Sequence, residues 1–142
     1  MWKTHYSLCI TSWIFVLPIA YVLYKFLRNE SIPTFEYILV GLICINIGFS
    51  VAFWYNPLQD SAIHIYDAFF AKLSMMTVMF YFLSQVNHPV DVVVFLTILV
   101  GIVASAYFSN HFSEMEWCCN RHVQSHGFMH LFCGLGCVYA MV

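Results

Sequence analysis

Apolar residues dominate the chain in five long stretches, and short polar segments separate them. The stretches cover residues 9–27, 35–55, 63–83, 92–108 and 123–142. Each approaches the ~17–25 residues that an α-helix needs to cross a hydrocarbon core about 30 Å thick. We therefore predict an all-α bundle of five transmembrane helices, the first of them kinked or loosened at Pro18.

The composition indicates an integral membrane protein with little chain outside the bilayer. Of the 142 residues, 62% are hydrophobic and 8% are charged, and the mean hydropathy is +0.79. A soluble domain of this size would need far more polar residues to cover its core. We expect one multi-pass membrane domain over residues 1–142, with membrane lipids as its immediate partners.

Charge and cysteine content exclude two other classes of protein. The formal net charge is −2, without a basic run of the kind that binds nucleic acid. The six cysteines lack the spacing of a disulfide framework, and most lie in the apolar stretches. Cys118 and Cys119 are adjacent beside the last stretch, where free or palmitoylated thiols are expected rather than a bridge.

Polar side chains recur at one depth in the predicted bundle. Up-and-down threading brings the end of the second and fourth stretches to the same membrane face as the start of the third and fifth. Ser50 lies just before the end of the second stretch, and Asp67 just after the start of the third. With His126 and His130 in the fifth, all lie roughly 5–11 Å below that face at 1.5 Å rise per residue.

His126 and His130 are the main indication of chemistry. Ionisable residues inside a membrane span are costly and usually face a partner, a cavity or an ion. The spacing of four residues places both imidazoles on one helix face, where two rings can bind one metal. His64 lies one turn shallower than Asp67, on nearly the same face of the third helix.

The set formed by Ser50, Asp67 and the run from His126 to His130 resembles the motif of the alkaline ceramidase and progestin/adiponectin receptor superfamily of membrane hydrolases. The segment Ser-His-Gly-Phe-Met-His-Leu-Phe, residues 125–132, is similar to the last-span signature of that superfamily. The resemblance implies a zinc ion bound by histidines, with His126 and His130 as ligands. The third histidine of the family falls where this chain has Trp54, so His64 is the expected replacement.

The resemblance further implies that Asp67 and Ser50 orient or activate water at the metal. Zinc held by three histidines keeps a fourth position for water, and a neighbouring carboxylate can act as general base. A site below the headgroups can reach the amide or ester bond of a lipid but hardly a soluble substrate. The sequence thus indicates a zinc-dependent hydrolase of lipid amide or ester bonds as one hypothesis.

Two other classes fit the same residues. Cys133 and Cys137 extend the stripe of His126 and His130 along the last helix, and thiolates and imidazoles also suit copper, so a soft-metal or haem protein for transport or redox chemistry is an alternative. A non-catalytic accessory or viral membrane component is the other, with residues 109–122 as its contact surface.

Lys72 lies near mid-membrane, where it needs snorkelling or a carboxylate partner.

Overall fold

The computed structural model describes residues 5–142, which form five long helices and no strand. The first helix consists of α1 (Tyr6–Thr11), the 3₁₀ segment η1 (Ser12–Phe15) and α2 (Val16–Leu27). The others are α3 (Thr34–Tyr55), α4 (Ala62–Gln85), α5 (Pro89–Met115) and α6 (Asn120–Met141). The predicted all-α bundle is confirmed, and each apolar stretch coincides with one helix.

Two helix boundaries differ from the predicted stretches because polar residues end an apolar run without ending a helix. α5 begins at Pro89, which suits the first helical position, and the His88 side chain caps it by accepting a hydrogen bond from the Val90 N–H at 3.3 Å. α6 begins at Asn120, where Cys119 Sγ accepts from the His122 N–H at 3.4 Å. Much of the predicted connection over residues 109–122 is therefore helical.

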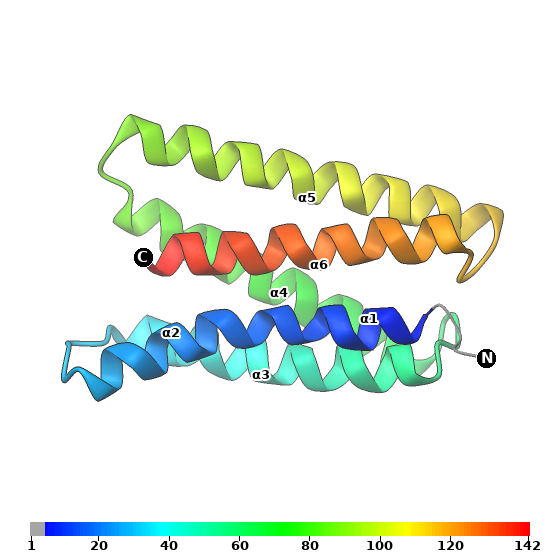
Figure 1. Ribbon diagram of the computed structural model, residues 1–142, viewed down its shortest axis with the longest axis horizontal. Helices are drawn as coiled ribbons and strands as arrows, with labels where there is room; N and C mark the ends of the chain where they lie inside the picture. Colours follow the sequence, from blue (N-terminus) through cyan, green and yellow to red (C-terminus); the bar gives the residue numbers. More distant parts are fainter. Residues whose placement is uncertain (1–4) are drawn as a thin grey trace.

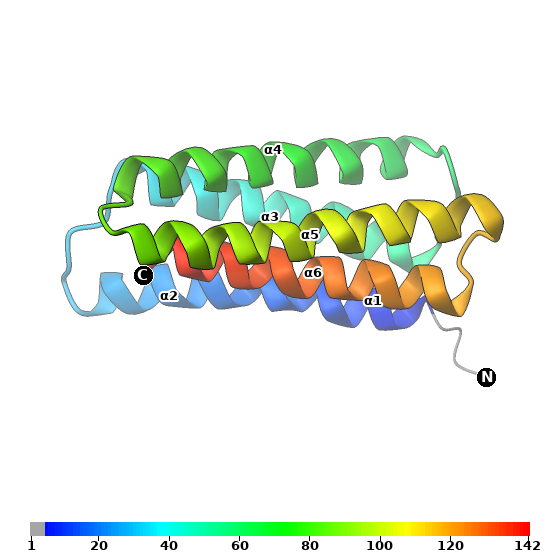
Figure 2. The same cartoon turned by 90° about the horizontal axis from the view of Figure 1, so that it is seen from above.

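The helices run up and down along the long axis of the bundle (Figure 1). α6 is central and packs against α5, α4 and the first helix, while α3 packs against α4 and the first helix. The connections α3–α4 and α5–α6 lie at the end where α1 begins, and the C-terminus lies at the other end (Figures 1 and 2). This up-and-down order places the start of α4 and the start of α6 at one end of the bundle. A common depth of Asp67, His126 and His130 needs this arrangement.

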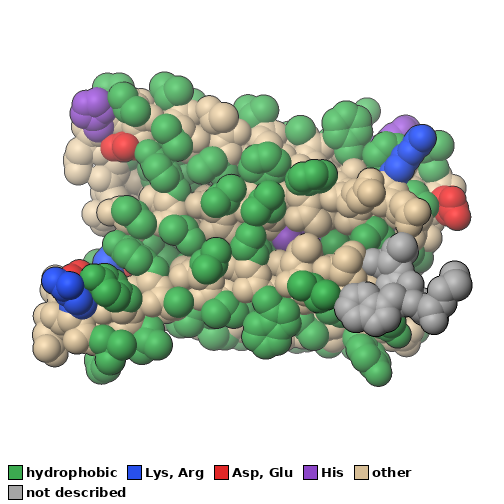
Figure 3. Space-filling view, in the orientation of Figure 1, with side chains coloured by type: hydrophobic (Ala, Val, Ile, Leu, Met, Phe, Trp, Pro, Cys, Tyr) green, Lys and Arg blue, Asp and Glu red, His purple; other side chains and the backbone are tan. Residues whose placement is uncertain are grey.

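Large apolar side chains cover the outside of the bundle. In Figure 3 they occupy the middle of the face, and the charged side chains lie at its two ends. Exposed examples from three helices are Leu23 (55%), Tyr37 (52%) and Val100 (67%). Within residues 5–142, three helices are long and apolar enough to cross a membrane, namely Tyr6–Leu27, Thr34–Tyr55 and Pro89–Met115.

Pro18 explains the 3₁₀ segment in the first helix. Proline has no N–H to donate to the carbonyl of Ile14, and its ring collides with that carbonyl in a regular α-helix. The chain relieves the conflict by tightening to i→i+3 geometry over Ser12–Phe15. The expected disturbance at Pro18 is therefore a change of helix type one turn before the proline.

Candidate functional site

Ser50 and Asp67 meet across the contact between α3 and α4. Both are buried, with 2% and 8% of their surfaces exposed. The Asp67 carboxyl group lies beside the Ser50 hydroxyl. Ser50 Oγ is also 2.9 Å from Ser12 Oγ on the first helix, and the Ser12 hydroxyl donates to the Leu8 carbonyl at 2.7 Å. Three helices therefore contribute to one buried polar chain.

His126 and His130 form a pair of packed imidazoles on α6. Their ring centroids are 4.8 Å apart, with an angle of 78° between the planes. A hydroxyl group from a neighbouring helix holds each ring. His126 Nδ1 lies 3.0 Å from Ser109 Oγ on α5, and His130 Nδ1 lies 2.9 Å from Thr11 Oγ1 on α1.

The two contacts of the Thr11 hydroxyl favour one tautomer of His130. Thr11 Oγ1 donates its proton to the Leu8 carbonyl at 3.2 Å, so the bond to His130 needs a proton on Nδ1. The lone pair of the neutral ring then lies on Nε2. A hydrogen bond at one imidazole nitrogen that leaves the other free is the arrangement that orients histidines as metal ligands.

Adjacent hydroxyl groups on the first helix join the two pairs. Thr11 binds His130, and Ser12 binds Ser50, so the histidine pair and the Ser50–Asp67 pair border the same turn of that helix. We call Thr11, Ser12, Ser50, Asp67, Ser109, His126 and His130 the polar layer. All five helices contribute to it.

His64 lies in a cluster of aromatic rings nearer the end of the bundle. Its ring stacks on Phe53, with centroids 4.7 Å apart and planes at 8°, and it meets Trp117 edge-on at 5.5 Å. Its Nδ1 accepts a hydrogen bond from the Asp60 N–H at 3.1 Å. The structure thus places His64 in aromatic packing, and between residues 5 and 142 no three His, Cys, Asp or Glu side chains are grouped to hold a metal.

Trp54 lies beside His126, at the position where the superfamily that this chain resembles has its third histidine. It is 1% exposed, and its ring meets that of His126 at 4.7 Å and 61°. Its Nε1–H is buried and has no hydrogen-bond partner among residues 5–142. A buried donor without a partner is costly, so this position combines tight packing with an unsatisfied polar group.

Sequence reasoning missed several members of this region. His122 was expected in a polar connection, but it is buried, accepts a hydrogen bond from the Cys118 N–H at 3.1 Å, and lies 6.0 Å from His126 ring to ring. Its spacing of four residues from His126 was the available signal. Thr11 and Ser12, near the start of the first apolar stretch, were also missed, as was Ser109, which directly follows the fourth stretch.

Cys118 and Cys119 are both free thiols in the connection between α5 and α6. Cys118 adopts a positive φ of 58°, which costs energy for a residue with a Cβ. Burial, with a smaller effect of Cys119, raises the pKa of the Cys118 thiol to about 11. The thiol is therefore protonated near neutral pH and weakly nucleophilic.

A groove leads from the outer surface to the polar layer between the first helix and α6. Its volume is about 380 Å³, and its lining is mainly apolar, with Leu8, Ile14 and Phe128 among the residues. Thr11, which binds His130, also lines it. Gly127 also lines it, and a Cβ added there would make ordinary van der Waals contact with Leu8 at 3.7 Å.

Comparisons with protein-family models, curated proteins and solved structures find no match to this chain. The class that fold and surface define is an all-α bundle with helices long and apolar enough to cross a membrane.

Proposed function

We propose that the protein is an integral membrane protein in which all five helices span the bilayer. The apolar outer surface supports this, because soluble monomeric proteins rarely expose so many large apolar side chains to water. α4 and α6 carry more polar residues than the other helices, but Asp67, His122 and His130 on them are buried in the bundle. These three side chains therefore face the protein rather than lipid, whereas Lys72 on α4 is exposed.

Five spans place the two ends of the chain on opposite sides of the membrane. The protein should stay in the membrane fraction after extraction at alkaline pH. Epitope tags at the N-terminus and after Val142 should be cleaved by external protease in opposite vesicle orientations. Equal accessibility of both tags would contradict an odd number of spans, and release at alkaline pH would contradict the membrane assignment.

We further propose that the polar layer is a zinc site for hydrolysis of lipid amide or ester bonds. Two observations favour it: Asp67 lies beside Ser50, and an apolar groove reaches the hydroxyl that orients His130. His126 and His130 fit as two ligands, whereas the third position holds Trp54 and His64 packs on Phe53. Zinc, when bound, would supply Lewis-acid chemistry and a water of lowered pKa.

The residues of the chain would then have distinct tasks. Asp67 would accept a proton, and Ser50 would turn its hydroxyl from Ser12 to donate a hydrogen bond to negative charge that develops on the scissile carbonyl. The groove would admit the acyl chain of a membrane lipid while keeping bulk water out. The resemblance to the ceramidase and progestin/adiponectin receptor superfamily agrees with this proposal and remains an expectation.

Metal content of the purified protein tests the first half of the proposal. Protein prepared in mild detergent without chelator should carry about one zinc per chain, and His126→Ala or His130→Ala should lose it, because too few ligands remain. His64→Ala should do the same if that residue completes the site. Trp54→His should strengthen zinc binding, since Trp54 contacts His126 directly.

Copper, haem or no metal in the purified protein would each indicate another class of protein. Copper in place of zinc, lost in Cys133→Ser or Cys137→Ser, would favour the soft-metal class, and a Soret band would indicate haem. Absence of metal from wild type, with zinc bound by Trp54→His, would mean that the tryptophan has replaced the ligand. That result would favour a non-catalytic membrane component.

Release of fatty acid in liposomes tests the second half. Asp67→Asn should keep the metal and lose about 10²–10⁴-fold in rate, the usual contribution of a general base. Ser50→Ala should lose roughly 10²–10³-fold. Thr97→Ala on α5 is a matched control, because that exposed hydroxyl donates to the Val93 carbonyl of its own helix. A metal-loaded wild type that hydrolyses no ceramide, phospholipid or acylglycerol would reject the hydrolase.

A further inference from the structure

Lys72 is a cation on the outer face of α4, near the middle of the helix. It is exposed, and its neighbours on that face are the exposed apolar residues Phe69 (56%) and Met76 (53%). The ion pairs within residues 5–142 are Lys25–Glu36 and Arg28–Glu30, so Lys72 has no acidic partner there. α4 lies along one edge of the bundle (Figure 2) and packs against α3 and α6.

Depth makes this lysine unusual. It lies ten residues after Ala62 and thirteen before Gln85, the ends of α4. These separations correspond to roughly 15 Å and 20 Å at 1.5 Å per residue. A four-carbon side chain is shorter than either distance and cannot easily carry its charge to the headgroups. An ionisable residue at this depth normally pairs with another polar group.

A second copy of the chain cannot supply a carboxylate at this depth. Of the seven acidic residues, Glu36 and Asp67 are buried, Asp91 lies in the first turn of α5, and the other four lie in or beside connecting loops. None is on an outer face at the depth of Lys72. A symmetric contact through α4 would instead bring two lysines together, and like charges repel in a medium of low dielectric constant.

We propose that the outer face of α4 around Lys72 binds a transmembrane helix of a different protein that carries an Asp or Glu near mid-membrane. This inference rests on the proposed membrane location but not on the zinc site. The ion pair sets the register of the two helices, and the exposed Phe69 and Met76 pack against the partner. The chain is therefore a subunit of a hetero-oligomeric membrane complex.

Energy transfer to a designed helix tests the proposal. The full chain carries a fluorescent donor after Val142 and is reconstituted in phosphatidylcholine vesicles. The acceptor is a Leu/Ala transmembrane peptide of about 20 residues with Glu, Gln or Leu at its centre. The Glu peptide should bind wild type about ten-fold more tightly than the Leu peptide, the scale of an interhelical polar contact in model peptides.

Variants assign the effect to one side chain. Lys72→Met should reduce binding of the Glu peptide to that of the Leu peptide. Leu73→Met, at the neighbouring exposed position, should leave it unchanged. Lys72→Glu should reject the Glu peptide and bind a peptide with a central Lys.

Three results would overturn the proposal. The first is equal binding of Glu and Leu peptides by wild type, or no effect of Lys72→Met. The second is self-association of wild type that Lys72→Met abolishes, which would make a second copy the occupant. The third is a Lys72-dependent preference for phosphatidylserine vesicles without peptide binding, which would assign the lysine to headgroups. A wild type that fails to float with the vesicles would instead contradict the proposed membrane location.

Discussion

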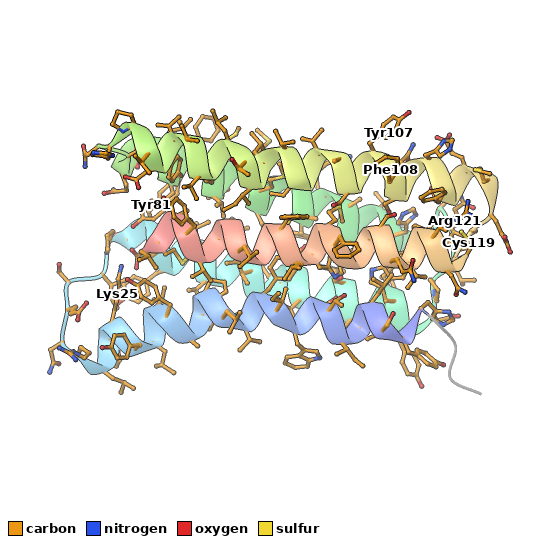
Figure 4. All side chains as sticks on the ribbon, turned by 45° about the horizontal axis from the view of Figure 1, so that its top comes forward. Lys25, Tyr81, Tyr107, Phe108, Cys119 and Arg121 are labelled. Atoms are coloured by element: carbon orange, nitrogen blue, oxygen red, sulfur yellow. The ribbon has the colours of Figure 1, made fainter. Side chains whose placement is uncertain are left out.

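At the scale of single residues, a buried ion pair joins the bundle at the end opposite the polar layer. Lys25 Nζ lies 2.9 Å from Glu36 Oε1, with side-chain exposures of 15% and 1%. The Tyr81 hydroxyl donates to the same oxygen at 2.6 Å, and Lys25 also donates to the Met141 carbonyl at 3.2 Å. Figure 4 shows Lys25 and Tyr81 at the end away from Cys119 and Arg121.

Glu36→Gln should destabilise the protein by about 3–5 kcal/mol, because removing one partner leaves a buried charge uncompensated. Unfolding in denaturing detergent, followed by circular dichroism, measures the change. The control is Arg28→Gln, since the Arg28–Glu30 pair is 60% and 47% exposed and such pairs contribute about 0–1 kcal/mol. Equal effects of both substitutions would show that the Lys25–Glu36 pair is not buried.

At the scale of elements, glycines set how closely α5 and α6 approach. A Cβ at Gly101 of α5 would lie 2.8 Å from the Phe132 ring of α6, and one at Gly136 would lie 3.3 Å from Ile98. Small residues that allow close backbone approach are the usual means of packing helices in a membrane, where lipid is as apolar as the side chains.

Gly101→Leu should destabilise the protein by about 1–3 kcal/mol through overpacking against Phe132. Gly48→Leu is the matched control, because a Cβ there meets nothing within 4 Å. The control should be neutral or stabilising by up to about 1 kcal/mol, since leucine favours helix more than glycine does. Detergent unfolding curves compare the two, and a larger loss at Gly48 would contradict the packing of α5 on α6.

At the scale of the whole molecule, polar contacts concentrate in two regions that lie far apart. Ser12 and Lys25 are separated by thirteen residues of one helix, or roughly 20 Å. Between the two regions lies an apolar cluster that includes Phe15, Leu39, Ile43 and Val78. The polar layer and the Lys25–Glu36 pair should therefore act independently on stability.

Double-mutant cycles should show this separation. Ser12→Ala combined with Glu36→Gln should be additive within about 0.5 kcal/mol, as expected for sites without shared partners. Ser12→Ala combined with Ser50→Ala should be non-additive, because the two hydroxyls are 2.9 Å apart and share one hydrogen bond. Coupling in the first cycle, or none in the second, would contradict the described contacts.

Local periodicity was enough to predict much of this fold. Apolar length alone indicated the five helices, and the spacing of four residues placed His126 and His130 on one face, since a helix repeats every 3.6 residues. Depth counted along antiparallel helices placed Ser50 near Asp67. Each of these inferences needs only the geometry of one helix or the order of neighbouring helices.

Contacts between distant helices were decided only by the tertiary structure. The pairing of Thr11 with His130, of Ser109 with His126 and of Lys25 with Glu36 depends on how each helix is rotated and shifted against its neighbours. Packing of many side chains fixes that rotation, and no local pattern encodes it. The stacking of the His64 ring on Phe53 likewise depends on tertiary packing, and the role of His64 as a third metal ligand stays a prediction.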